Sequence, residues 1–152
     1  MLPKGSIFFV TCCSKTKNKS MYQYSAIIRK VVDGDTIEID IDLGLSIWVR
    51  NEKIRLYGVN TPEVYGIKKG SPEWELGNKS SDFVKSNLKE NDQILVETIK
   101  DKKEKFGRYL GIIYLKIDPS VLEGLTNIRH IGDFYCLNDI LLGKGLAEEY
   151  MI

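Results

Sequence analysis

Four short segments of this 152-residue chain contain residue types that could bind a metal ion or a phosphate group. They are the runs Asp33-Gly34-Asp35-Thr36, Asn60-Thr61-Pro62-Glu63 and Lys105-Phe106-Gly107-Arg108, and the single residue Arg55. The only histidine in the sequence is His130, which excludes histidine-pair chemistry and histidine-rich metal sites. We interpret His130 as a surface or loop residue, so catalysis is expected from carboxylates, arginines, lysines or tyrosines.

Taken singly, each of these segments also has an ordinary structural explanation. Asp-Gly is a frequent hairpin turn, and Asn-Thr-Pro-Glu could be a turn or the start of a helix. Arg55 lies between Ile54 and Leu56 and could face solvent on a half-buried strand. The calcium-loop template of the EF-hand is not met, because Ile37 stands where a further ligand is needed.

The elements that must position these residues are mainly strands. Residues 24–32 are rich in β-branched and aromatic side chains, and Asp33-Gly34 predicts a tight hairpin turn, because glycine accepts positive φ without steric cost. Isoleucine alternates with acidic residues across 37–42, which is typical of a half-buried strand. Further strands are expected over 46–59, with an interruption near 51–52, and over 93–99 and 109–117.

Helices are expected later in the chain. Ser71-Pro72-Glu73 combines a capping hydroxyl, a first-turn proline and an acidic residue, and predicts a helix that runs to about residue 91. Gly77 weakens the first turn of that helix. Residues 119–134 could hold a short helix, and 137–150 are interpreted as a final amphipathic helix. The fold class is therefore α+β, mainly β: a small antiparallel barrel decorated by helices.

The composition suits one soluble domain rather than a membrane protein. Hydrophobic residues make up 43% of the chain, and no apolar run approaches the roughly 20 residues of a membrane span, so no transmembrane segment is expected. The net charge is +1, yet the first 30 residues contain six basic and no acidic residues. The remainder is thus net negative, which argues against gripping long nucleic acid by charge alone. A nucleic-acid function would need a local site, helped by a bound cation.

Residues 1–22 differ from the rest and are interpreted as an N-terminal tail. They contain a short apolar cluster, Ile7-Phe8-Phe9-Val10, then Cys12, Cys13 and a polar run. Upstream sequence before a start at Met21 and a remnant lipoprotein signal are the alternatives, although the apolar core is short for a signal. The compartment therefore stays open between cytoplasmic and secreted or surface-anchored. Three cysteines without a C-x-x-C pair indicate neither a disulfide framework nor a zinc site.

Together and in order, the segments resemble the staphylococcal nuclease family. The resemblance rests on Val31-Val32-Asp33-Gly34-Asp35-Thr36-Ile37, on Ile54 through Glu63, on Lys105-Phe106-Gly107-Arg108, and on the closing run Leu137 through Ala147. It extends over residues 24–150, and places a nuclease-like domain at 23–152. It implies a five-stranded OB-type barrel with about three helices.

The resemblance also implies the site. Asp35, Asn60 and Thr61 are expected to bind calcium (Ca2+), Thr61 through its backbone carbonyl. Glu63 is expected to orient or deprotonate the attacking water, and Arg55 and Arg108 to hold the phosphate. The implied activity is a calcium-dependent endonuclease, expected to be monomeric, that acts on DNA and RNA. It would prefer single strands and would cleave the 5′ P–O bond to leave 3′-phosphates.

The chemistry of these residue types agrees with that expectation. Phosphodiester hydrolysis concentrates negative charge at phosphorus, which cations stabilise most in the transition state. The planar guanidinium of arginine can grip two phosphate oxygens at once. Ca2+ accepts a loose shell of 6 to 8 oxygen ligands. Further substrate contacts are expected from Lys68 and Lys69, on the counterpart of a substrate-facing loop, and from Tyr109, which could stack on a base.

One residue departs from the family pattern. The position of Asn60 is an aspartate in the best-known family member, so the amide keeps an oxygen ligand but removes one negative charge. Weaker calcium binding is expected, not its loss. The rival hypothesis is a catalytically inactive barrel that binds nucleic acid or protein, as in the family's Tudor-associated repeats. Retention of both arginines, of Asp35 and of Glu63 favours the enzyme.

Overall fold

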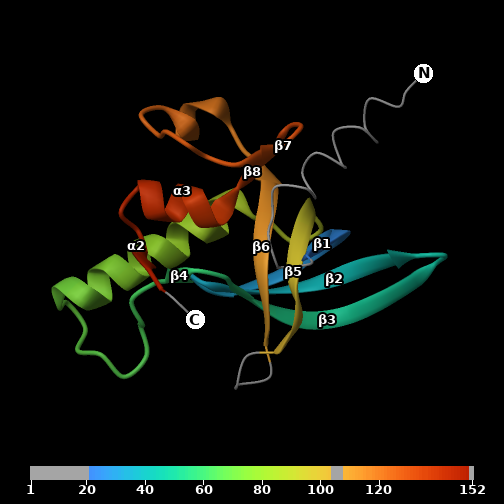
Figure 1. The fold of residues 1–152 in the computed structure, drawn as a ribbon. Helices are drawn as coiled ribbons and strands as arrows, with labels where there is room; N and C mark the ends of the chain where they lie inside the picture. Colours follow the sequence, from blue (N-terminus) through green and yellow to red (C-terminus); the bar gives the residue numbers. More distant parts are fainter. Residues whose placement is uncertain (1–20, 104–107, 151–152) are drawn as a thin grey trace.

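A closed five-stranded barrel forms the centre of the computed structural model, which describes residues 21–103 and 108–150 (Figure 1). Its strands are β1 (Met21–Asp33), β2 (Thr36–Gly44), β3 (Ile47–Leu56), β5 (Gln93–Lys103) and β6 (Tyr109–Lys116). They pair in the order β3-β2-β1-β5-β6, and β6 then pairs with β3. The expected α+β, mainly β, OB-type barrel is confirmed.

One of the barrel pairings is parallel. The pairs β1–β2, β1–β5, β2–β3 and β5–β6 are antiparallel, whereas β3 and β6 run in the same direction. Their register matches Ile54 with Tyr109, Arg55 with Leu110, and Leu56 with Gly111. We call these three residue pairs the seam, because they close the barrel between segments far apart in the sequence.

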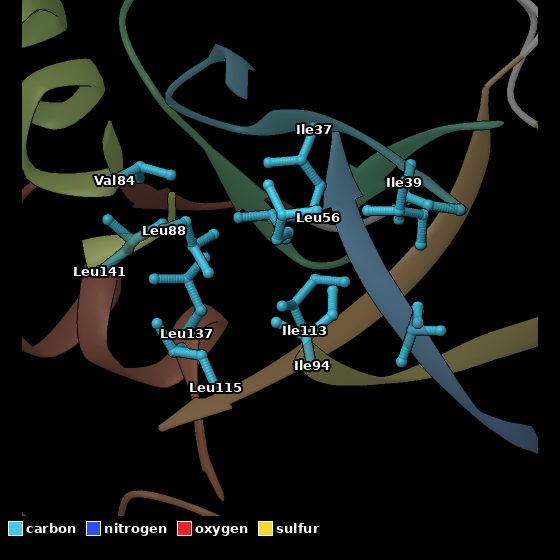
Figure 2. Close-up of a cluster of buried hydrophobic side chains, with 14 of the residues drawn as sticks. Ile37, Ile39, Leu56, Val84, Leu88, Ile94, Ile113, Leu115, Leu137 and Leu141 are labelled. Carbon is cyan, nitrogen blue, oxygen red and sulfur yellow. The ribbon is translucent and has the colours of Figure 1, made fainter. Parts of the chain in front are cut away.

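Alternating side chains fill the barrel. The isoleucines at 37, 39 and 41 are almost fully buried, as the period-2 pattern predicts. They pack against buried residues of every other barrel strand and of both helices (Figure 2). The central members of this core are Ile28, Ile37, Ile39, Ile54, Leu56, Ile94, Ile113, Leu115, Leu137 and Leu141. Because Ile54 and Leu56 point inward, the side chain of Arg55 must point to the outer face of the barrel.

The buried carboxylate of Asp40, on β2, links the β2–β3 hairpin and β1 through hydrogen bonds. Asp40 is 1% exposed, and accepts hydrogen bonds from Arg29 Nε at 2.5 Å, Arg50 Nη1 at 2.9 Å and the backbone amide of Asn51 at 2.8 Å. Burial alone would raise the pKa of Asp40, but these donors outweigh it and hold the pKa below its usual value. Asn51 has φ 52° and lies where the β2–β3 register shifts. The interruption expected near 51–52 is thus an irregularity inside a continuous strand.

Two α-helices and a short 3-10 helix complete the described residues. Helix α2 (Pro72–Asn87) begins as predicted, with the Ser71 hydroxyl accepting from the backbone amide of Trp74 at 3.3 Å, and it ends slightly earlier than expected. The 3-10 helix η1 (Pro119–Leu122) lies in the segment where a short helix was considered. Helices α2 and α3 (Leu137–Gly143) lie on the same side of the barrel (Figure 1). None of the helices in the described part is long and apolar enough to cross a membrane.

The expectation of a helix over 137–150 is wrong beyond its first half. Helix α3 ends at Gly143, because Gly145 adopts φ 70°. The amides of Gly145 and Leu146 then donate to the carbonyls of Leu142 and Leu141, which is the Schellman pattern of helix termination. The chain continues into β9 (Glu148–Glu149), which pairs with β4 (Val59–Asn60). The end of the described chain therefore lies beside one of the predicted site segments.

A small outer layer covers the far side of β6. Strand β8 (Phe134–Cys136) pairs with β6, and β7 (His130–Ile131) pairs with β8. Cys136 is fully buried there, and its burial raises the pKa of the thiol to about 12. This cysteine is free; Cys12 and Cys13, like nearly all of the predicted tail 1–22, lie outside the described residues.

Candidate phosphate-binding and metal site

Five of the predicted site residues meet on the outer face of the barrel. Asp35 lies in the turn between β1 and β2, and Arg55 is near the end of β3. Asn60 ends β4, Thr61 follows it, and Arg108 directly precedes β6. These positions are separated by up to 73 residues in the sequence, and the closed barrel brings them together. Lys105 to Gly107 lie outside the described residues.

Asp35 is held by donors from neighbouring segments. It is 8% exposed, and its Oδ1 accepts a hydrogen bond from the Thr36 hydroxyl at 3.1 Å. Its Oδ2 lies 3.4 Å from the amide nitrogen of Thr61 and 3.5 Å from Nη2 of Arg55. Its backbone carbonyl accepts from the amide of Leu56 at 2.9 Å. The carboxylate therefore has a fixed orientation before any ligand binds.

Arg55 is the most enclosed cation of the site. It is 9% exposed, and its Nη2 donates to Oδ1 of Asn60 at 3.0 Å. Its guanidinium carbon lies 5.3 Å from the ring centroid of Tyr150, a cation–π contact. Its Nε is buried and has no hydrogen-bond partner in the described part of the chain. A buried donor without a partner is uncommon, and an oxyanion beside this edge of the guanidinium would supply the acceptor.

Arg108 reaches the same site from the other side of the seam. Its Nη1 donates to the Thr36 hydroxyl at 3.1 Å, and that hydroxyl donates to Asp35. Thr36 is paired with Arg55 across β2 and β3, so its side chain lies on the same outer face. Arg55 on β3 thus contacts Asp35 directly, and Arg108, just before β6, is linked to it through the Thr36 hydroxyl. Two guanidinium groups close to one carboxylate suit a phosphate bridged by a cation.

Glu63 lies at the exposed edge of this group. The carboxylate of Asp33 has a raised pKa, because it is partly buried and because the negative charges of Asp35 and Glu63 act on it. The backbone amide of Gly34 and the charge of Lys85 oppose that shift. The interaction places Glu63 close enough to Asp33 to influence its ionisation. An exposed carboxylate beside a phosphate site can accept a proton from water.

Gly34 is required for a different reason from the one predicted. It is absent from the residues with positive φ, so the turn does not need left-handed backbone at this position. Instead, a Cβ at Gly34 would lie 2.8 Å from the hydroxyl oxygen of Thr61. Similarly, a Cβ at Gly77 would lie 2.7 Å from the carbonyl oxygen of Pro62. Both glycines allow the segment 60–63 to pack closely against β1–β2 and α2.

Asn138, on α3, holds the seam together through hydrogen bonds from its side chain to three backbone groups. It is 1% exposed, and its Oδ1 accepts from the amide of Ile113 at 3.1 Å. Its Nδ2 donates to the carbonyls of Tyr57 at 2.9 Å and Gly111 at 3.3 Å. One side chain of α3 therefore ties the chain beyond β3 to β6. This contact positions Arg55 and Arg108 indirectly.

The remaining predicted substrate contacts lie on the loop before α2 and at the start of β6. Lys68 and Lys69 are exposed on the loop between β4 and α2, where the amide of Ser71 donates to the carbonyl of Lys68. Tyr109 is 37% exposed. It is separated from the core residues Ile113 and Leu115 of the same strand by an even number of positions, so its side chain points toward the barrel interior. The predicted substrate-binding roles of all three stay predictions.

The oxygen donors of the site are of the kind that a hard cation such as Ca2+ prefers. Oδ2 of Asp35 and Oδ1 of Asn60 lie within 3.5 Å of the same arginine nitrogen, so they converge. One carboxylate, one amide and a backbone carbonyl, completed by water, suit Ca2+. Within the described residues, no group of three or more His, Cys, Asp or Glu side chains is arranged for a metal.

Three contributors escaped the sequence analysis. Thr36 lies in a candidate segment but has no predicted role of its own, whereas Asn138 and Tyr150 appear only within the predicted helix over 137–150. The signal for Asn138 was a polar residue between the apolar positions Leu137 and Ile140. No sequence pattern would have placed Tyr150 over Arg55, because the contact depends on where α3 ends.

An OB-type barrel with two arginines and an acidic, oxygen-rich turn on its outer face defines a domain suited to binding a phosphate together with a cation. The family described as staphylococcal nuclease homologues matches residues 53–152, and the chain belongs to this family.

Relatives agree with that assignment. The chain is 36% identical over 119 residues to a thermonuclease of Staphylococcus intermedius, which covers 76% of this chain and 63% of that protein. It is also 36% identical over 145 residues to an uncharacterized protein of Methanocaldococcus jannaschii, covering 84% and 60% of the two chains. Endonuclease YhcR of Bacillus subtilis is 34% identical over 109 residues, covering 69% of this chain and 8% of the endonuclease. The chain thus spans about three fifths of the length of the first two relatives.

Proposed function

We propose that this protein is a calcium-dependent phosphodiesterase that hydrolyses DNA and RNA, with a preference for single strands. The observation that carries the proposal is that Arg55 contacts Asp35 directly and Arg108 is linked to it through the Thr36 hydroxyl. A second support is that two of the similar proteins are a thermonuclease and an endonuclease. All of the site residues come from one chain, so a monomer suffices.

In the proposed reaction, Arg55 and Arg108 hold the non-bridging oxygens of the scissile phosphate. Glu63 accepts a proton from a water molecule whose oxygen forms a bond to phosphorus, and the bond from phosphorus to the 5′ oxygen breaks. The proton then passes to that leaving oxygen, which gives a 3′-phosphate and a 5′-hydroxyl. The arginines stabilise the charge that develops during this step more than they stabilise the bound substrate.

Asp35, Asn60 and the carbonyl of Thr61 would hold the calcium ion. When bound, Ca2+ polarises the phosphoryl oxygen and adds positive charge beside it. The hydrogen bonds that orient Asp35 keep its carboxylate directed toward this position. Preorganisation of this kind lowers the cost of assembling the site when the substrate arrives.

The test is degradation of single-stranded DNA and RNA with millimolar calcium or with a chelator. Calcium-dependent cleavage is expected, and Glu63→Gln is expected to lower it by orders of magnitude. Glu75→Gln, at an exposed glutamate in the first turn of α2, is the matched control and should retain activity. If wild-type protein binds an oligonucleotide but never cleaves it, the protein is an inactive binding module and the proposal is wrong.

A further inference from the structure

The open end of the barrel contains a pocket that the proposed reaction does not use. Its volume is about 310 Å³, which is at the lower end of the range of small-ligand sites. Inward-facing side chains of all five barrel strands line it, among them Tyr22, Tyr24, Glu52, Thr98 and Tyr109. We call this cavity the mouth pocket.

Three tyrosines line the mouth pocket together with the aliphatic residues Ile41, Leu43, Val49 and Ile99. The rings of Tyr22 and Tyr24 have centroids 6.5 Å apart and an interplanar angle of 23°. Tyr22 is 46% exposed and Tyr109 is 37% exposed, although both lie on the inward-facing side of their strands, like the buried core residues. Aromatic rings that line an open cavity suit a flat ring system, because stacking on such platforms contributes strongly to base binding.

Glu52 and Thr98 add polar groups to the described lining of the mouth pocket. Glu52 occupies an inward-facing position on β3. A carboxylate has several acceptor positions and no donor. It therefore favours a ring that carries an exocyclic amino group, as cytosine does, over one that carries a carbonyl there, as uracil does.

The mouth pocket adjoins the phosphate site through one strand. Arg108 and Tyr109 are consecutive residues at the start of β6. Tyr109 points into the mouth pocket, whereas Arg108 bonds Thr36 on the outer face. A nucleic acid strand with a phosphate at Arg108 would therefore pass the rim of the pocket.

We propose that the mouth pocket binds a nucleobase of the substrate strand and prefers bases with an exocyclic amino group. This inference rests on the proposed nuclease function for its biological setting. Tyr22 and Tyr109 stack on the base, and Glu52 accepts from its amino group. The pocket thus selects which nucleotide lies one or more positions away from the scissile phosphate.

The experiment is a nitrogen-15 amide NMR titration of the full chain with cytidine, with uridine, and with octyl glucoside as an apolar probe. Cytidine is expected to cause saturable shifts at Tyr22, Thr98 and Tyr109, with an affinity about fivefold higher than that of uridine. Glu52→Gln should abolish that preference. Thr98→Phe, which fills the pocket, should remove the shifts, and Tyr22→Leu provides a second variant if Thr98→Phe fails to fold.

Tyr135→Leu is the matched control, because Tyr135 lies in β8 and contacts His130. It should leave the titration unchanged. Shifts confined to the surroundings of Arg55, or none at all, would overturn the proposal. Tighter binding of octyl glucoside than of cytidine at the same amides would overturn it too, since the pocket would then be an alkyl-binding site.

A parallel cleavage assay separates this proposal from the nuclease proposal. If the protein cleaves single-stranded DNA and no nucleoside enters the mouth pocket, the nuclease stands and the base pocket is wrong. If cytidine saturates the pocket without any cleavage, base binding stands and the nuclease is wrong. Where both hold, Tyr22→Leu should raise the KM for an oligonucleotide by about fivefold or more, the cost expected for a lost stacking platform. The KM for bis-p-nitrophenyl phosphate should be unaffected.

Discussion

Nη2 of Arg55 donates a hydrogen bond to the side-chain oxygen of Asn60 at 3.0 Å. The same nitrogen lies 3.5 Å from Oδ2 of Asp35. One arginine thus shares its guanidinium between the two side chains that are proposed to bind the metal. Cation and phosphate sites are coupled at this atom, since a calcium ion would compete with Arg55 for the same oxygens.

Asn60→Asp is expected to tighten calcium binding by roughly tenfold, because a second carboxylate adds the negative charge that Ca2+ ligands usually supply. Isothermal titration with calcium alone measures the effect without relying on activity. Asn127→Asp makes the same chemical change on an exposed loop and should leave calcium affinity unchanged. An unaltered affinity in Asn60→Asp would show that residue 60 is not a ligand.

Gly34→Ala is expected to disturb the site, because its new Cβ would meet the Thr61 hydroxyl at 2.8 Å. Overpacking of this kind costs about 1 to 3 kcal/mol of unfolding free energy. Removing the Thr61 hydroxyl and methyl in the double variant Gly34→Ala/Thr61→Ala should recover part of that loss. Urea denaturation of the two single variants and the double variant measures the coupling. Strict additivity would contradict the close contact.

Asn138→Ala is expected to lower the unfolding free energy by about 3 kcal/mol, because it leaves the Ile113 amide and two carbonyls without their partner in a buried position. Cleavage should fall together with stability, since the seam positions both arginines. Chemical denaturation and cleavage assays on the same samples test this. Asn87→Ala, on α2, is the control, because its amide bonds only the carbonyl of Phe83 among the described contacts.

The Asp40 cluster is expected to make stability depend on acid. The pKa of this carboxyl is lowered in the folded protein, so its contribution is fully present above the unfolded-state pKa of about 4 and is lost as the pH falls through the folded value. Asp40→Asn should cost about 2 kcal/mol near neutral pH, the scale of hydrogen bonds to a charged acceptor. The gap between variant and wild type should close at lower pH.

Urea denaturation between pH 7 and pH 2.5 measures this gap. Asp82→Asn, at an exposed position of α2, provides the comparison. Its unfolding free energy should depend on pH in the same way as that of the wild type. A gap that stays constant with pH would indicate that Asp40 acts through packing and not through its charge.

The sequence allowed the barrel strands to be predicted well, because their signal is local. The alternation around Ile37, Ile39 and Ile41 matches side chains that are buried on one face. The capping pattern at Ser71 likewise marks the true start of α2. Both features depend on residues within a few positions of one another.

The features that the sequence did not reveal depend on distant contacts. Alternation on β2 assigned Asp40 to a solvated face, but Arg29 and Arg50 enclose it from β1 and β3. Gly34 was attributed to backbone conformation, whereas the reason is the approach of Thr61. Helix α3 was extended too far, because a single glycine at 145 outweighs the apolar periodicity that follows.

The site residues themselves were identified through ordered motifs and family resemblance, not through their contacts. Their assembly follows from barrel closure, which residue spacing alone does not show. Thr36 illustrates the difference, since its hydroxyl links Arg108 to Asp35 only once β6 lies beside β3.

The seam has a consequence for how the protein would fail on heating. Arg55 and Arg108 lie on opposite sides of a junction that comprises three residue pairs. Short junctions of this kind open locally at lower free-energy cost than the whole domain unfolds. Local opening of the seam would separate the two guanidinium groups while the other strand pairs of the barrel stayed intact. Thermal inactivation should therefore precede the loss of secondary structure. A ligand that binds both arginines at once should stabilise the closed barrel.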